Sequence, residues 1–397
     1  MSESDPNQNP PPEAAAPATV PEGPACPVTA ERLAPQMRKY VDFKGSAGGR
    51  MFAAKGMVPL QGADFAHVMF MLTFDPDEKV RAQAMTTAGA PDDRTKKVLL
   101  AALRDEDLEQ PVLHFYAQVL AGKEDLLELI ALNNTTADET VAEMVLNASP
   151  KLAELISQNQ LRTLRTPLIL RNLCGNPNAS KATVDLACDF AVRSGVVMDD
   201  VPAMKEARIR IHGPDIIDAP PPQDQVTADQ ILEQEAETLK KDNAEPLVEG
   251  SQKKMTLVQK IMKMQVAEKI KLATLGNKEA RSLLLRDSNK LVAMAAIGSP
   301  RITDGEVLLM AGNKTCNDDV LRYIYGNRSW TKNYKIKLAL VRNAKVPAAI
   351  GMKFLTTLRD SELKDIAKDK NVPSAVQQQA KKMVEKKNAP VKVGGDH

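Results

Sequence analysis

The sequence has few aromatic, histidine and cysteine residues, and each shortage excludes a class of structure or chemistry. Only 4% of the 397 residues are aromatic, so the interior is expected to be aliphatic, as in packed helices. Four histidines and four cysteines, without a Cys-x-x-Cys pair, give no pattern typical of a zinc site, a disulfide framework or histidine-based catalysis. We therefore predict no metal, no cofactor, no small-molecule substrate and no enzymatic activity.

Long apolar runs and phosphate-binding loops are also missing. The longest apolar stretches, such as 68–74 and 291–297, are far shorter than the about 18 residues of a membrane span. Residues 1–20 lack the basic start and apolar run of a secretory signal. The glycine-rich segment 45–50 lacks the Lys-Ser/Thr ending of a phosphate loop. The expectation is a cytoplasmic protein without a membrane span.

The charge is divided unequally along the chain. Residues 1–250 contain 24 basic and 38 acidic residues, a net charge of −14, whereas residues 251–397 contain 29 and 13, a net charge of +16. The formal total of +2 conceals this asymmetry. The two halves either carry ordinary solvated surfaces, or the basic half meets an acidic partner.

Composition divides the chain into five segments. A proline-rich tail (1–29) has too few apolar residues to fold, and the tail 386–397 should fray. Residues 211–250 are predicted to be an acidic linker, because 214–250 holds 10 acidic and 2 basic residues. This linker is expected to fold back on the basic half, with 227–241 helical only when docked. The remaining segments, 30–210 and 251–385, are predicted to be two helical-repeat domains.

Five loops share one pattern, which indicates internal repeats. Each has an apolar helix end, a polar turn, a small or branched apolar residue and then a helix cap or proline. Thr303 and Glu306 additionally fit a capping box. The loops lie at 132–138, 174–180, 297–303, 341–347 and 367–373. Their irregular spacing fits one to two helical hairpins for each repeat.

One segment has the pattern of a known repeat family. Residues 74–84 combine Asp-Pro, Val-Arg and Ala, and a weaker copy follows at 103–107. The chain therefore resembles HEAT-like and leucine-rich-variant helical-repeat proteins, and its C-terminal half resembles an uncharacterised bacterial helical-repeat family. The resemblance implies an all-α fold, an α-solenoid of irregular HEAT-like helical hairpins in two blocks joined by the acidic linker. It implies no particular function, because repeat folds have many unrelated functions.

Aromatic and basic residues are interleaved between residues 322 and 345. Such a mixture is typical of protein-binding hot spots and of surfaces that stack on nucleic-acid bases. The alternative is that the rings only wedge adjacent repeats while the lysines reach solvent. The candidate binding residues are Arg322, Tyr323, Tyr325, Arg328, Trp330, Lys332, Tyr334, Lys335 and Lys337.

Other candidates have ordinary structural interpretations. Cys174 is expected to be a small core residue, and His67 and His114 to be packed, hydrogen-bonded side chains. Residues 253–271 form a basic amphipathic pattern with Leu257, Ile261 and Met264 on one stripe. We expect the first helix of the second domain there, although an anionic membrane surface or a partner groove would fit the same pattern.

These observations together favour a binding protein over an enzyme. We expect a non-catalytic protein-protein interaction scaffold or adaptor that uses an extended helical-repeat surface, with a partner that carries an acidic surface. The alternative is a nucleic-acid-binding protein that acts through the basic C-terminal half.

Overall fold

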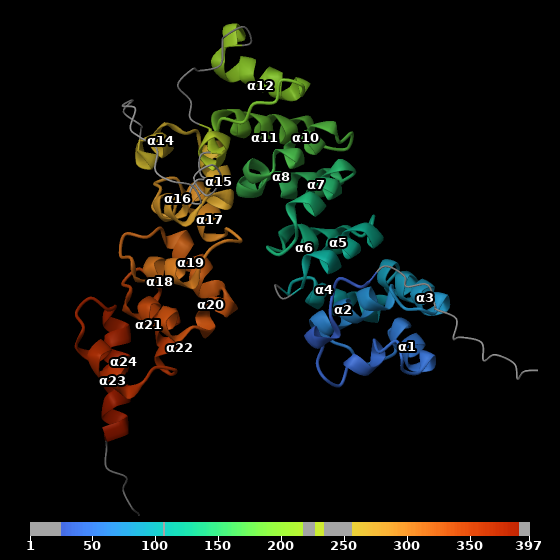
Figure 1. Cartoon of the computed structure of the whole chain (residues 1–397), viewed down its shortest axis with the longest axis horizontal. Helices are drawn as coiled ribbons and strands as arrows, with labels where there is room; N and C mark the ends of the chain where they lie inside the picture. Colours follow the sequence, from blue (N-terminus) through green and yellow to red (C-terminus); the bar gives the residue numbers. More distant parts are fainter. Residues whose placement is uncertain (1–24, 106–107, 217–226, 234–255, 389–397) are drawn as a thin grey trace, which may run out of the picture. The chain divides into compact units, whose positions relative to one another are not determined.

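The computed structural model describes residues 25–105, 108–216, 227–233 and 256–388, and every regular element in these residues is a helix. The predicted all-α class of stacked helical hairpins is confirmed (Figure 1). The chain forms two compact units, Met1–Thr140 and Val141–His397. The predicted tails 1–24 and 389–397 and the linker residues 217–226 and 234–250 lie outside the described residues.

The first unit contains two short 3-10 helices followed by α-helices that pack in sequence order. Contacts link α1 to α2 and α3, α2 to α4, and α3 to α5. The elements are η1 (Ala30–Arg32), η2 (Arg38–Tyr40), α1 (Ala47–Ala54), α2 (Gly62–Leu72), α3 (Glu78–Gly89), α4 (Asp93–Ala102), α5 (Gln110–Val119) and α6 (Glu124–Leu132). Helix α7 (Asp138–Leu146) spans the boundary between the units.

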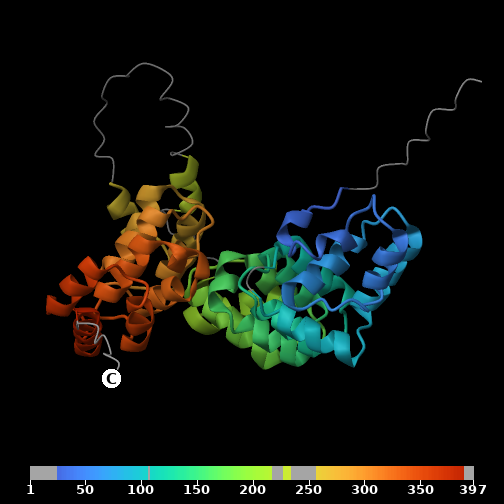
Figure 2. The same cartoon turned by 90° about the horizontal axis from the view of Figure 1, so that it is seen from below.

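The second unit is also built from stacked short helices, which Figures 1 and 2 show from two directions. Its first helices are α8 (Pro150–Ser157), α9 (Gln160–Arg165), α10 (Pro167–Gly175), α11 (Lys181–Arg193), α12 (Pro202–His212) and η3 (Pro214–Ile216). After the linker come α14 (Leu257–Lys263), α15 (Val266–Leu275), α16 (Lys278–Leu284), α17 (Lys290–Ile297), α18 (Asp304–Gly312), α19 (Asp318–Gly326), α20 (Arg328–Lys332), α21 (Tyr334–Arg342), α22 (Ala348–Leu355), α23 (Asp360–Lys368) and α24 (Ser374–Asn388).

Helix boundaries follow from capping residues and prolines. Asp77 caps α3 by accepting a hydrogen bond from the Lys79 N–H, which satisfies one of the amides left free at a helix start. Thr303 and Glu306 form the capping box predicted for α18. Proline occupies the first turn of four helices, where its missing N–H costs nothing: α5, α8, α10 and α12. All five predicted loops connect consecutive helices.

Buried asparagines brace three of these loops. Asn133, Asn176 and Asn343 each donate two side-chain hydrogen bonds, 2.8–3.1 Å long, to carbonyls about 30 residues earlier. Their Oδ1 atoms accept an N–H two residues later in the turn. These braces satisfy carbonyls left free at the preceding helix end, so they fix one hairpin against the next.

The core is aliphatic, as the composition predicts. Buried side chains are mainly Leu, Ile, Val, Ala and Met, and Tyr116 is the largest that is fully buried. Its hydroxyl lies 3.5 Å from the carbonyl of Ala66. His67 and His114 are hydrogen-bonded to the Ala63 carbonyl and the Thr140 hydroxyl, at 2.8 and 3.0 Å, so both are packed as expected.

In the second unit, helices from before and after the linker pack together. Helix α9 contacts α15 and α17, and the Ala267 N–H donates to the Ser194 carbonyl at 3.0 Å. Gly195 has a φ of +92°, and a Cβ there would lie 2.6 Å from the Cβ of Gln265, so this close approach requires glycine. The predicted domains 30–210 and 251–385 thus both contribute to this unit, whose boundary falls inside 30–210.

Part of the acidic linker is docked on α15. Residues 228–233 are helical, and Ala228 and Ile231 are buried. The Ala228 N–H donates to the Glu268 carboxylate at 2.7 Å, and Lys271 pairs with Asp229 at 2.7 Å. This short segment therefore contacts the basic half through both apolar burial and charge.

The predicted single helix over 253–271 is wrong in one respect. Helix α14 ends at Lys263 and α15 begins at Val266, because Met264 and Gln265 are extended. Burial of Met264 and the Ala267–Ser194 hydrogen bond stabilise this break. Ile261 and Met264 of the predicted stripe are buried in the protein's own core. None of the helices in the described ranges has the length and apolar character needed to cross a bilayer.

Candidate functional site

The nine predicted binding residues lie on three consecutive short helices, α19, α20 and α21. Asparagine caps start all three: Asn317, Asn327 and Asn333 accept backbone N–H bonds at 2.9–3.4 Å. Asn333 also donates to the Asp304 carboxylate at 3.1 Å, which ties the α20–α21 junction to α18. These hydrogen bonds define the backbone turns between the three helices.

Two of the rings contact each other edge to face. Tyr323 of α19 and Trp330 of α20 have ring centroids 5.7 Å apart and planes at 67°, an edge-to-face geometry. Both side chains are half-buried, as is Tyr325. The pair packs α19 against α20, and both rings keep part of their surface exposed.

Tyr334 has a different environment, since it joins α21 to the start of α23. Its hydroxyl donates to the Glu362 carboxylate and accepts the Arg359 N–H at 3.0 Å. The Arg359 guanidinium lies over the ring, 5.1 Å from its centroid, and the Lys337 ammonium lies 6.0 Å away. Tyr334 therefore contributes to the packing between repeats, with its polar group already hydrogen-bonded.

Four cations on the same three helices are exposed. The Arg322 side chain is 70% exposed and lies 3.6 Å from Asp319 on its own helix. Arg328, Lys332 and Lys335 are exposed, and none has an ion-pair partner among the described residues. We call these three cations and the Tyr323–Trp330 pair the basic-aromatic face. Its free positive charge and partly exposed rings suit it to contact an anionic surface.

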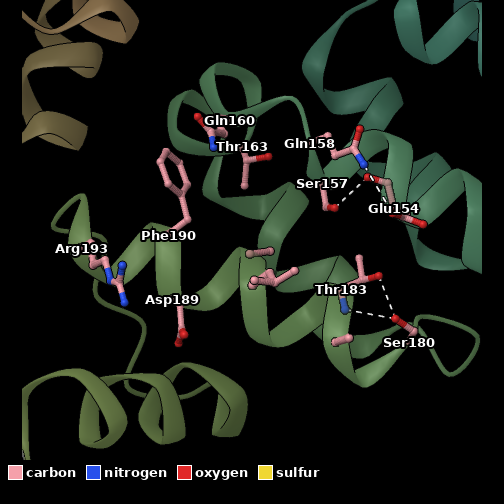
Figure 3. Close-up of a pocket in the computed structure, with 13 residues that line it drawn as sticks. Glu154, Ser157, Gln158, Gln160, Thr163, Ser180, Thr183, Asp189, Phe190 and Arg193 are labelled. Atoms are coloured by element: carbon pink, nitrogen blue, oxygen red, sulfur yellow. Dashed lines mark hydrogen bonds between the residues drawn. The ribbon is translucent and has the colours of Figure 1, made fainter.

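A groove of about 660 Å³ between α8, α9 and α11 was not identified from the sequence. Phe190 points from α11 towards Gln160 and Thr163 of α9, and Leu186, one turn earlier, is 72% exposed (Figure 3). The groove is lined by Glu154, Ser157, Gln158, Gln160, Thr163, Ser180, Ala182, Thr183, Leu186, Ala187, Asp189, Phe190 and Arg193. The only available sequence signal was the Leu186–Phe190 spacing of one helical turn.

The groove residues can bind but have no nucleophile-base arrangement. Ser180 and Thr183 bond each other at 2.8 Å, and the Ser157 hydroxyl donates to the Glu154 carbonyl at 2.7 Å, so these hydroxyls serve the helix ends. Asp189 points away to Arg210 of α12, with which it pairs at 2.5 Å (Figure 3). Neither histidine nor cysteine lines the groove.

The fold also brings two cysteines together. Cys174 of α10 and Cys188 of α11 have Sγ atoms 3.5 Å apart, a pairing that was not predicted from the sequence. Cys188 is buried and Cys174 is half-buried, so the latter is less enclosed than the core position predicted for it. Within the described parts of the chain, no three His, Cys, Asp or Glu side chains are grouped as metal ligands.

Comparison with protein-family models, with curated proteins and with solved structures found no match to this chain.

Proposed function

We propose that this chain is a non-catalytic, cytoplasmic scaffold that binds another protein through its basic-aromatic face, and that the partner presents an acidic surface. The observation that carries the proposal is the exposure of Arg328, Lys332 and Lys335, without ion pairs among the described residues, on α20 and α21, in the same segment as the half-buried Tyr323–Trp330 pair. Aromatic rings flanked by cations are the usual composition of an interface hot spot.

The charge of the surrounding half supports an acidic partner. Residues 251–397 carry a net charge of +16, which raises the local concentration of anionic partners and speeds their association. Stacked helices suit such binding, because each repeat adds contact area without requiring a deep pocket.

Charge reversal of the face should remove the partner. We expect R328E/K332E/K335E to weaken partner capture by about tenfold or more, since it turns attraction into repulsion at the contact. The measurement is quantitative affinity capture from native extract by the full chain. K368E/K381E/K382E is the control, because it makes the same change in net charge at exposed lysines of α23 and α24. If both variants lose partner capture equally, the effect comes from the net charge of the chain, and the proposed role of the basic-aromatic face is contradicted.

Substitution of Trp330 should separate binding from stability. W330A is expected to reduce capture about tenfold. It should cost the fold only about 1 kcal/mol, because the ring is half-buried and its stacking with Tyr323 contributes modestly. Y334A should instead lower the melting temperature, since it removes the α21–α23 contact. A large stability loss for W330A with unchanged capture would assign the indole to packing alone.

Nucleic-acid binding through the basic half is the second candidate, and the same net charge favours it. Duplex or single-stranded nucleic acid of mixed sequence should then bind the full chain with an affinity that falls steeply and linearly in log salt. R328E/K332E/K335E should make the slope of log affinity against log salt less steep, by the amount that corresponds to about three lost phosphate contacts. Weak binding without a steep slope would exclude this candidate.

A further inference from the structure

Two free thiols from adjacent helices lie within reach of each other in the second unit. Cys174 is the second-last residue of α10, and Cys188 lies in the middle of α11. Their Sγ atoms are 3.5 Å apart. A disulfide bond is about 2.0 Å long, so bond formation requires the sulfur atoms to approach by about 1.5 Å.

The two thiols differ in accessibility and acidity. The hydrogen bond from the Cys188 S–H lowers the pKa of Cys174 below that of an ordinary thiol. That same bond, together with burial, raises the pKa of Cys188. Cys174 is also the more exposed of the two. Because the thiolate is the nucleophile, Cys174 should react first and Cys188 second.

A basic side chain, Arg210, also lies near the two cysteines. Arg210 of α12 pairs with Asp189 at 2.5 Å and lies 3.6 Å from Asp185, both on α11 beside Cys188. Asp185 raises the pKa of the Cys188 thiol further, and the Arg210 guanidinium lowers it by a smaller amount. This basic group could not be predicted from the residues next to the cysteines, because Arg210 is 22 residues from Cys188 along the chain.

We propose that Cys174 and Cys188 form a redox pair that a hydroperoxide converts into an intramolecular disulfide. The Cys174 thiolate attacks one peroxide oxygen, the O–O bond breaks, and an alcohol or water leaves with a proton while Cys174 becomes a sulfenic acid. Cys188 Sγ then attacks Cys174 Sγ, and the sulfenic oxygen leaves as water with the Cys188 proton. The two sulfur atoms lose two electrons, which the peroxide gains. An external dithiol reverses the reaction by exchange.

The test uses hydrogen peroxide and the full chain. After treatment with one equivalent of peroxide, free thiols are alkylated under denaturing conditions and the chain is digested with trypsin. Cleavage after Arg171, Lys181 and Arg193 places the two thiols on separate peptides, 172–181 and 182–193. We expect these peptides to appear joined, and to separate after reduction with dithiothreitol. Overoxidised or unreacted Cys174, or disulfide-linked dimers of the chain, would overturn the proposal.

Variants assign the order of the two steps. In C188S, Cys174 should accumulate as sulfenic acid, trapped by dimedone, whereas in C174S position 188 should stay reduced. Cys316 is an internal control, because it is buried and burial raises its pKa to about 11. Cys174 should be oxidised about tenfold faster than Cys316 or more. Equal rates at the two thiols would show that the pair has no special reactivity.

Discussion

Replacing Glu306 by alanine is expected to lower the free energy of unfolding of the second unit by about 3–5 kcal/mol. Glu306 is 1% exposed and forms a two-pronged ion pair with Arg281, at 3.2 and 3.3 Å. The carboxylate also accepts the Thr303 hydroxyl and N–H, at 2.7 and 3.0 Å. Its removal leaves a buried guanidinium without a counter-charge, and this uncompensated charge is the main cost.

The control separates the value of the pair from the cost of breaking it. The double substitution R281M/E306L replaces both charges by apolar side chains of similar size, and it should destabilise less than E306A does. Urea denaturation followed by circular dichroism measures both variants. A double variant that loses more than E306A would show that the ion pair itself, and not the stranded charge, stabilises this unit.

Acid should reduce the contribution of Glu306. Burial raises the pKa of its carboxyl, but the hydrogen bonds from Thr303 and Arg281 outweigh burial, and the net pKa lies below its ordinary value. The contribution is therefore complete above the unfolded pKa of about 4.3 and disappears as the pH falls through the lower folded pKa. The stability difference between the wild type and E306Q should be largest near neutral pH and shrink in acid.

The Arg281 arrangement is present twice in the chain. In the first unit, Arg50 pairs with the buried Asp75 at 2.6 Å and donates to the Gly45 carbonyl at 2.5 Å. In the second, Arg281 pairs with Glu306 and donates to the Gly276 carbonyl at 2.9 Å. In both, the carbonyl is 5 residues before the arginine and the acid 25 residues after it. In each unit, therefore, one buried arginine connects its own helix to the carbonyl before that helix and to the acidic residue 25 positions later.

Local signals in the sequence predicted the helices and loops well, whereas pairs of residues far apart in the sequence could not be predicted. The capping box at Thr303 and the loop at 341–347 could be predicted because each depends on residues within one turn of each other. The Arg50–Asp75 pair could not, since a charged residue is ordinarily assigned to the surface unless its partner is known. The break at Met264 could not be predicted either, because the Ala267 N–H that follows it donates to the Ser194 carbonyl, which is still more distant in sequence.

The candidate sites show the same difference between local and long-range features. The basic-aromatic face is contiguous in sequence, so its members could be named in advance. The bracing role of Tyr334 could not, because Arg359 and Glu362 are 25 and 28 residues away. The groove depends on how α8 and α9 pack against α11, and the Cys174–Cys188 pair depends on how α10 packs against α11. Neither residue spacing nor composition contains that information.

Replacing Asn343 by alanine should produce the second large effect, a loss of about 3 kcal/mol from the second unit. The side chain is 2% exposed and donates to the carbonyls of Ala311 and Asn313 at 2.8 and 3.1 Å. Alanine removes both donors at the end of α18: the Asn313 carbonyl keeps the Cys316 N–H, whereas the Ala311 carbonyl loses its side-chain partner. Unsatisfied buried acceptors cost more than the net value of the hydrogen bonds, because water cannot replace the lost partner.

Asn313 provides the matched control, because it holds the same place in the loop after α18 that Asn343 holds after α21. It is half-buried, and its Oδ1 accepts the Thr315 N–H at 2.9 Å. The same Oδ1 also accepts the exposed Thr315 hydroxyl at 2.9 Å. N313A should therefore cost only about 1 kcal/mol, because these turn hydrogen bonds are exposed to water, which can replace them. Denaturation midpoints of the two variants, measured at one pH, test the difference. If N343A and N313A lose equal stability, the asparagines act only within their own turns. A threefold larger loss for N343A would instead establish that these side chains connect each hairpin to the one before it.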